Sequence, residues 1–404
     1  MLARLWLLFL REEIGVDMLL WLLIRIRMKI GIDASRYGHE TATGVEWYSY
    51  HIINGILSEA LKHEDTEVIL YSRDEVVIPK ELEHPRKVRR RVLPAKRFWT
   101  LFKLSREMKK NPPDILFVPS HTLPLKRPRY SVITIHDTAF KYLRKSYSRF
   151  AYWHLNWSTK YAVKHASRII VPSEATKQDL VQFFKCPVHK IVVVPHGYKK
   201  PRKIDIKEVS ENLKHFGFGI HESSQTETHS PYIFFIGRLE SKKNLARLVE
   251  SFKDFSDSRP DWRLVLAGKQ GLGFEEIISK VRSLGLENKV IMPGYIDENE
   301  KAYLYQNCRI FAFPSLYEGF GLPVLEAFAY KKPVMTSHVS CLPEVAGDAA
   351  MYCDPFDSGD MARCLERLAN DREFADGLAQ KGHDRLDRFS WERSVKQTYD
   401  VLVK

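Results

Sequence analysis

The chain has 404 residues, of which 44% are hydrophobic and 28% charged, so it is long enough for two domains with separate cores. Its five cysteines are scattered without a Cys-x2-Cys spacing, which excludes a disulfide-rich scaffold and a zinc ribbon. The net charge of +13 comes from the first half, because residues 1–200 contain 35 Lys and Arg against 19 Asp and Glu.

Residues 1–27 contain two apolar runs, Leu5–Leu10 and Met18–Ile24, which are separated by charged residues. Each run is much shorter than the roughly 20 residues that span a bilayer, and no signal-peptide cleavage pattern follows. Two interpretations stay open. The segment is an interfacial membrane helix, or it is an extension upstream of a true start at Met28, which we slightly favour.

Residues 28–200 alternate short apolar runs with longer helical stretches, and this alternation predicts a parallel, doubly wound sheet. The predicted strands are Lys29–Asp33, Val68–Tyr71, Ile115–Pro119, Ser131–His136, Arg168–Pro172 and Ile191–Pro195. The predicted helices are Val45–Leu61, Tyr152–His165 and Ala175–Phe184.

Residues 201–230 are polar, and we predict a linker with a flexible loop there. The alternation of strands and helices resumes over residues 231–388, which predicts a second α/β domain of the same kind. Its predicted strands are Tyr232–Gly237, Trp262–Gly268, Val290–Pro293, Arg309–Pro314, Pro333–Thr336 and Ala350–Cys353. Its predicted helices are Leu245–Phe255, Glu275–Leu284, Glu298–Gln306, Val324–Ala329 and Asp360–Asn370. Ligands of such sheets bind beyond the carboxyl ends of the strands, so the cleft between the domains is the expected site.

Two glutamates flank a glycine-rich turn in the second domain. Glu318 lies in the turn that follows the strand Arg309–Pro314, and Glu326 lies in the helix that begins near Pro323. Glycines at a strand-to-helix turn let backbone N–H groups approach a phosphate, and the helix N-terminus favours negative charge. The residues of this turn are Gly319, Phe320, Gly321 and Leu322. Carboxylates beside it are well placed to bind sugar or ribose hydroxyls.

Two cations follow another strand of the second domain. Arg238 and Lys243 come directly after Tyr232–Gly237, with Lys242 as an alternative for the lysine. A guanidinium fork and an ammonium group together form a clamp for a diphosphate. The sequence contains no Asp-x-Asp pair, which a metal-bound nucleotide would require, so we predict a metal-independent site without a cofactor.

Further candidates follow other strands. His136 and Asp137 end the run Tyr130–Asp137, and His121 follows the preceding strand. A lone histidine is more often structural than functional. Gly44, in the first strand-to-helix loop, allows close backbone approach to a phosphate or sugar. Gly268 opens Gly-Lys-Gln-Gly-Leu-Gly, whose spacing does not match a redox dinucleotide fingerprint.

These motifs resemble those of the retaining glycosyltransferases of family 4, also called glycosyltransferase group 1, which have the GT-B fold of two Rossmann-like domains facing a cleft. The resemblance runs from about Met28 to the C-terminus. It implies transfer of a sugar from a nucleoside-diphosphate sugar to a hydroxyl, with retained configuration. It also implies that the last helix, within residues 389–404, crosses back to the first domain.

The resemblance also implies roles for single residues. Arg238 and Lys243 would hold the diphosphate and stabilise it as it leaves, Glu326 would bind the ribose, and Glu318 and His136 would contact the transferred sugar. The nucleotide base would lie near Gly268 and Tyr295. His121 and Asp137 would lie on the acceptor side, and Gly44 would touch both substrates. One departure is Lys331-Lys332, where the family usually has glycine, so helix Val324–Ala329 must end without its usual cap.

Within the family, the motifs look most like those of bacterial mannosyltransferases that use GDP-mannose in surface polysaccharide assembly, with UDP- and dTDP-sugars left open. We expect a glycan or lipid-linked acceptor and a cytoplasmic enzyme peripheral to the inner face of the membrane. The basic runs Arg86–Arg91 and Lys103–Lys110, interleaved with Phe98, Trp99 and Phe102, favour an anionic membrane surface over solvated loops. No nucleic-acid-binding signature accompanies them.

Two alternatives from other classes remain. The chain could be a GT-B epimerase or hydrolase that acts on the nucleotide sugar without an acceptor, or a non-catalytic nucleotide-sugar-binding protein.

Overall fold

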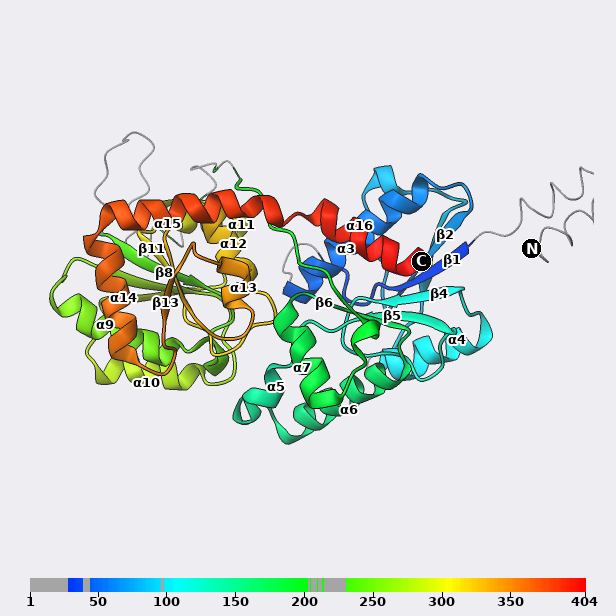
Figure 1. The fold of residues 1–404 in the computed structure, drawn as a ribbon, viewed down its shortest axis with the longest axis horizontal. Helices are drawn as coiled ribbons and strands as arrows, with labels where there is room; N and C mark the ends of the chain where they lie inside the picture. The colour runs from blue at the N-terminus through cyan, green and yellow to red at the C-terminus, as the bar shows by residue number, and fades with distance from the viewer. Residues whose placement is uncertain are drawn as a thin grey trace, which may run out of the picture.

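The computed structural model describes residues 28–38, 44–95, 98–202, 204, 209, 213 and 230–404. The predicted extension at residues 1–27 and most of the predicted linker lie outside the described residues. Two parallel sheets, each flanked by helices, form two domains that lie side by side (Figure 1).

The first sheet has seven strands in the order β3-β2-β1-β4-β5-β6-β7, and all neighbouring strands are parallel. The strands are β1 (Met28–Asp33), β2 (Thr66–Ser72), β3 (Val88–Val92), β4 (Ile115–Val118), β5 (Tyr130–Thr134), β6 (Arg168–Val171) and β7 (Ile191–Val193). The α-helices are α3 (Gly44–Leu61), α4 (Ser105–Lys110), α5 (Ala139–Tyr142), α6 (Arg149–His165) and α7 (Glu174–Phe184). The inner strands are buried on both faces, as their continuous apolar runs require.

The second sheet has six parallel strands in the order β10-β9-β8-β11-β12-β13. Its strands are β8 (Tyr232–Ile236), β9 (Arg263–Ala267), β10 (Val290–Gly294), β11 (Ile310–Phe313), β12 (Val334–Ser337) and β13 (Met351–Cys353). Its helices are α9 (Leu245–Asp257), α10 (Phe274–Ser283), α11 (Glu298–Asn307), α12 (Leu322–Ala329), α13 (Leu342–Ala346), α14 (Ser358–Asn370) and α15 (Arg372–Arg385). Both sheets have the doubly wound order, so the predicted fold class is confirmed.

Two local features differ from the sequence expectation, and a third, the end of α12 without glycine, agrees with it. Residues Val88–Val92, inside the basic run that we assigned to a surface loop or patch, form the edge strand β3. Val209 and Leu213, inside the predicted linker, are buried in the core of the second domain. Helix α12 ends with Lys331 at φ +53°, so a lysine takes the left-handed position that glycine usually fills.

The last helix, α16 (Trp391–Val403), leaves the second domain and packs against α3 of the first (Figure 1). The Tyr130 hydroxyl donates to the Val401 carbonyl at 2.9 Å, and the Ser394 hydroxyl donates to the Pro195 carbonyl. Val395 lies directly over Gly55 of α3, where a Cβ atom would come within 2.1 Å of a Val395 methyl group. A glycine inside α3 therefore makes room for the crossing helix.

This packing is testable with a matched pair of glycines inside helices. Ala normally stabilises a helix interior by about 1 kcal/mol relative to Gly. Gly55→Ala should nevertheless lower the free energy of unfolding by about 1–2 kcal/mol, because overpacking costs about 1–3 kcal/mol. Gly377→Ala in α15, where an added Cβ would meet no atom within 4 Å, should raise it. Urea titrations measure both, and equal effects of the two substitutions would contradict the packing.

Candidate active site

A cleft of about 630 Å³ lies between the two domains. Most of the predicted site residues line it, together with several that we did not predict. The predicted ones are Gly44, His136, Asp137, Arg238, Lys243, Gly268, Tyr295, Glu318, Gly319, Phe320, Gly321 and Leu322. The others are Val45, His196, Ile236, Gly237, Glu240, Lys269, Ile296 and Pro323. Lys242, which we named as the alternative lysine, also lines the cleft.

The lining residues all follow strands or begin helices at the facing edges of the two sheets. In the first domain they come from the start of α3 and from the segments after β5 and β7. In the second domain they come from the segments after β8, β9 and β10, and from the turn between β11 and α12. Each sheet thus presents the carboxyl ends of its strands to the cleft, where ligands of doubly wound sheets bind.

The glycine turn of the second domain touches the first domain. A Cβ atom on Gly319 would lie 1.9 Å from the His136 carbonyl oxygen, so no side chain fits there. Gly321, with φ +97°, begins α12, and Pro323 occupies the first turn of that helix. Proline has no backbone N–H, which costs nothing here because the first N–H groups of a helix have no partner within the helix. The other N–H groups of this first turn make this end of the helix suited to an anion.

Two lysines and two carboxylates lie next to this turn, with side-chain exposures of 10% for Glu318, 12% for Lys243, 16% for Lys242 and 29% for Asp137. The Lys243 ammonium group lies 2.5 Å from Glu318, and the Lys242 ammonium group lies 3.8 Å from Asp137. Burial alone would raise the pKa of Glu318, but Lys243 and Lys242 outweigh it and lower this pKa. Burial alone would lower the pKa of Lys242, but Asp137 and Glu318 raise it. Lys242 is therefore protonated and Glu318 ionised at neutral pH, so Glu318 has no proton to donate.

Arg238 is different, because it is solvent-exposed and forms no salt bridge to another described residue. Its side chain packs over Gly271, where a Cβ atom would come within 2.8 Å of the Arg238 Cγ. The guanidinium group is therefore available to a ligand in the cleft, whereas Lys243 must be shared between a ligand and Glu318.

Three histidines form a buried group beside the cleft. The His136 ring lies 5.4 Å from that of His121 and 5.8 Å from that of His196. Burial, helped by His121, lowers the pKa of His136 to about 3, so the imidazole is neutral. Its Nε2 lies 3.1 Å from the Pro119 carbonyl, which can only accept a hydrogen bond, so Nδ1 is left as an acceptor. His136 can therefore accept a hydrogen bond from a sugar hydroxyl.

The buried histidines predict acid sensitivity. The pKa values of His136, His121 and His196 are lowered by burial, whereas in the unfolded chain they return to about 6.5. Below about pH 6.5 the unfolded chain binds protons that the native state does not, so stability falls as pH falls. Between pH 6 and pH 5, His136→Gln should reduce the slope of the unfolding free energy against pH by about 1.4 kcal/mol per pH unit. This value corresponds to one proton fewer taken up on unfolding. Exposed His189→Gln is the control, and an equal change there would contradict this assignment.

A hydroxyl network joins the two domains beside Glu318. The Asp179 carboxylate of α7 accepts hydrogen bonds from Thr138 and Tyr142, each at 2.6 Å, and from Tyr317 of the second domain. In a second contact between the domains, the Ser173 hydroxyl of the first domain donates a hydrogen bond of 2.8 Å to the Gly319 carbonyl of the turn. The position of the turn that carries Glu318 is therefore fixed by the first domain.

Glu344, in the first turn of α13, adds a further contact between the domains. Its carboxylate accepts hydrogen bonds from the Glu174 and Ala175 N–H groups at the start of α7, at 2.9 Å and 3.4 Å. A carboxylate at a helix N-terminus is favourable.

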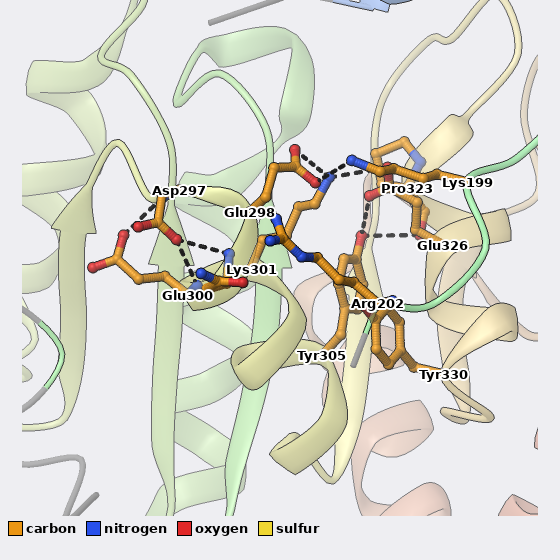
Figure 2. Close-up of polar contacts among 11 residues, drawn as sticks. Lys199, Arg202, Asp297, Glu298, Glu300, Lys301, Tyr305, Pro323, Glu326 and Tyr330 are labelled. Carbon is orange, nitrogen blue, oxygen red and sulfur yellow. Dashed lines mark hydrogen bonds and ion pairs between the residues drawn. The ribbon is translucent and has the colours of Figure 1, made fainter. Parts of the chain in front are cut away.

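Glu326 is not among the residues that line the cleft. Its carboxylate accepts a hydrogen bond from the Tyr305 hydroxyl at 3.1 Å and from Lys301 at 3.4 Å (Figure 2). Lys301 also pairs with Glu298 at 3.0 Å, and Glu298 pairs with Lys199 at 2.8 Å. The predicted ribose-binding carboxylate is thus linked through ion pairs to the segment that leaves the first domain.

His121 also lies outside this cleft. It lines a separate cavity of about 510 Å³ in the first domain, and Val45 lines both cavities.

Sequence reasoning missed His196 and Lys269, although each comes within three residues of a strand end. The same signal identified His136 and Gly268.

The basic run of the first domain is largely paired. Arg89, Arg90 and Arg91 of β3 form salt bridges of 2.7, 2.5 and 2.9 Å to Glu67, Glu83 and Glu107. These three arginines, which we expected to face an anionic membrane, have acidic partners, and the membrane surface itself stays a prediction. Within the described ranges, the helices are too short or too polar to cross a bilayer.

Two family models match the chain. One, described as "Glycosyl transferases group 1", matches residues 219–385, and the other, described as "Glycosyltransferase Family 4", matches residues 44–199. Together they cover most of both domains, including the cleft.

Individual proteins are also similar. The O-antigen chain mannosyltransferase B of Escherichia coli is 26% identical over 288 residues, which are 70% of this chain and 72% of that protein. By contrast, the matches to the longer serotype-specific mannosyltransferase WbdA of E. coli cover 20% or 29% of its length.

Two solved structures share the fold over 93% of this chain. WaaG, a glycosyltransferase involved in lipopolysaccharide biosynthesis, has a TM-score of 0.68 at 14% identity and is covered over 99% of its length. HepE of Anabaena, in complex with UDP and glucose, has a TM-score of 0.65 at 17% identity and is also covered over 99%.

Proposed function

Because the chain belongs to the glycosyltransferases of group 1 and family 4, we propose that its cleft transfers a hexose, with mannose favoured, from a nucleoside-diphosphate sugar to an acceptor hydroxyl with retained configuration. The observation that carries this proposal is the grouping, in one cleft, of Arg238, Lys243 and the N-terminus of α12 with Glu318 and His136. The first three suit a diphosphate, and the last two suit sugar hydroxyls.

In the proposed reaction, the bond between the sugar C1 and the diphosphate oxygen breaks, and a bond from C1 to the acceptor oxygen forms on the same face. Negative charge grows on the leaving diphosphate. Arg238, Lys243 and the backbone N–H groups of Gly319–Gly321 would stabilise that charge, which is where preorganised groups contribute most to a rate. The buried positions of Lys243 and Glu318 keep this arrangement fixed before the substrate binds.

The carboxylates position the donor in this proposal and do not act as acid and base. Glu318 is ionised and paired with Lys243, so it can accept hydrogen bonds from the sugar but has no proton to give. We assign no covalent nucleophile. In this proposal the leaving phosphate takes the proton of the acceptor hydroxyl, so protons balance without a protein base.

The two glutamates should differ in kinetic effect. Glu318→Ala should lower kcat by about a hundredfold, because it removes a sugar contact and frees the Lys243 position. Glu326→Ala should instead weaken donor binding by about tenfold, through loss of the ribose contact and of the Lys301 pair. Steady-state kinetics and calorimetric titration of the nucleotide measure these effects, with the exposed Glu276→Ala as control. Equal losses of nucleotide affinity in the two variants would contradict the division of roles.

The donor and acceptor rest on resemblance. We favour GDP-mannose because the chain matches 72% of the length of O-antigen chain mannosyltransferase B of Escherichia coli. We propose that the acceptor is a glycan or a lipid-linked glycan of surface polysaccharide assembly. A cytoplasmic enzyme peripheral to the inner face of the membrane would meet such an acceptor. Exposed basic residues of α4 in the first domain support that location.

The activity itself has a direct test. In EDTA, the chain should transfer mannose from GDP-mannose to a lipid-linked or glycan acceptor at the rate seen with Mg²⁺, because cationic side chains replace a metal. A panel of GDP-, UDP- and dTDP-sugars, screened by thermal stability, identifies the donor, since a ligand at 100 times its Kd stabilises by about 2.7 kcal/mol. Activity lost in EDTA and restored by Mn²⁺ would refute metal independence. Donor turnover that is as fast without acceptor would instead identify a hydrolase or epimerase.

A further inference from the structure

The second cavity of about 510 Å³ lies in the first domain, next to the donor cleft. One part of its lining is cationic or polar and includes Arg36, Arg73 and His121, and another part is apolar and includes Phe98, Leu101 and Phe150. No Asp or Glu occurs among the described residues that line it. The cavity therefore offers positive charge and apolar surface to the same ligand.

The polar part contains buried groups without partners. Arg73 Nε and His121 Nδ1 are buried and form no hydrogen bond in the described structure. Asp33, at the end of β1, interacts electrostatically with Arg73 but is itself outside the lining, and burial raises its pKa. The pair between Arg36 and Glu46 is long, at 3.9 Å, and the Arg36 side chain is 57% exposed. An unsatisfied buried donor such as Arg73 Nε is costly, and an anion in the cavity would satisfy it.

The apolar part continues onto the surface. Phe98 and Phe150 are 50% and 63% exposed although they line the cavity. Their rings lie 6.2 Å from Phe102 and 6.3 Å from Trp153, which are also more than half exposed. We call these four residues the aromatic rim. Exposed residues Lys103, Arg106, Lys109 and Lys110 lie on the adjoining segment and on α4. Aromatic residues among cations suit the head-group zone of an anionic membrane.

We propose that this cavity binds the phosphate or diphosphate group of a membrane-anchored acceptor, with the lipid chain along the aromatic rim. The inference rests on the proposed function and specifies its acceptor as an anionic amphiphile. The His121 ring lies 5.4 Å from that of His136, and Val45 lines both cavities. A sugar attached to the bound phosphate would therefore reach into the donor cleft beside His136.

Octyl phosphate, inorganic phosphate and octanol are simple probes of this cavity. Calorimetric titration of the full chain should show that octyl phosphate binds at least tenfold more tightly than the other two, because it alone has both a charged head and a chain. Octanol binding as tightly would show that the charge is not recognised. Inorganic phosphate binding as tightly would show that the apolar part has no role. Either result would overturn the proposal.

Variants separate the two parts of the cavity. Arg73→Gln should weaken octyl phosphate about tenfold, as expected for a lost charged hydrogen bond. Phe150→Ser should weaken octyl phosphate but leave inorganic phosphate unchanged. Arg106→Gln, an exposed arginine outside the lining, is the matched control. If Arg106→Gln lowered the affinity for octyl phosphate as much as Arg73→Gln does, general attraction by surface cations and not a specific site would explain the binding. Unchanged thermal stabilisation by the nucleotide sugar shows that each variant is folded.

The two proposals can fail separately. Selective binding of octyl phosphate without hexose transfer from any nucleotide sugar would support the cavity and refute the proposed function. Transfer to neutral glycans, with no binding of octyl phosphate, would retain the transferase and refute the cavity.

Discussion

The close approach of Gly319 to the backbone of His136 is the constraint on which the arrangement of the cleft depends. A Cβ atom on Gly319 would lie only 1.9 Å from the His136 carbonyl oxygen, so this contact exists only because the residue has no side chain. It brings the turn after β11 in the second domain against the segment after β5 in the first. Hydrogen bonds from Ser173 and Tyr317 fix the residues on this turn in the same position. The glycine turn is therefore held in place by both domains.

Charge balance follows from that contact. The approach of the turn to the first domain brings Glu318, Lys242, Lys243 and Asp137 together with most of their side-chain surface out of solvent. Each of these charges has an opposite neighbour. Arg238, which forms no salt bridge within the described part of the chain, is exposed at the edge of the same cleft. The site is thus preorganised for a ligand that carries two or more negative charges, which is what a nucleoside diphosphate brings. The neutral histidines on the opposite wall add hydrogen-bonding capacity without adding charge.

Much of this could be predicted from the sequence, because parallel strands of buried α/β domains have continuous apolar runs and glycines mark their functional turns. The strands that were missed or shifted have physical reasons. Strand β3 has arginine at three successive positions, and only its ion pairs with Glu67, Glu83 and Glu107 make it suitable for a sheet edge. Glu67 and Glu107 belong to other elements of the chain, so no local pattern reveals these two partners.

The site shows the same limit. Most residues that follow strands were found, since position along the chain places them at the correct edge of a sheet, but His196 and Lys269 were missed. The surroundings of Glu326 could not be predicted, because Tyr305 and Lys301 belong to α11 and reach it only through packing of two helices (Figure 2). His121 was assigned to the correct domain, but its separation from the donor cleft depends on the shape of a cavity that no motif encodes.

Hydrogen exchange tests most directly whether one donor site is built from both domains. The exchange of backbone amides should be compared with and without the nucleotide sugar that stabilises the chain most. Protection should appear together in the second-domain segments Gly237–Lys243 and Glu318–Pro323 and in the first-domain segments around Gly44 and His136. Protection confined to the second domain, with Gly44 and His136 unchanged, would contradict a site that depends on the contact between Gly319 and His136.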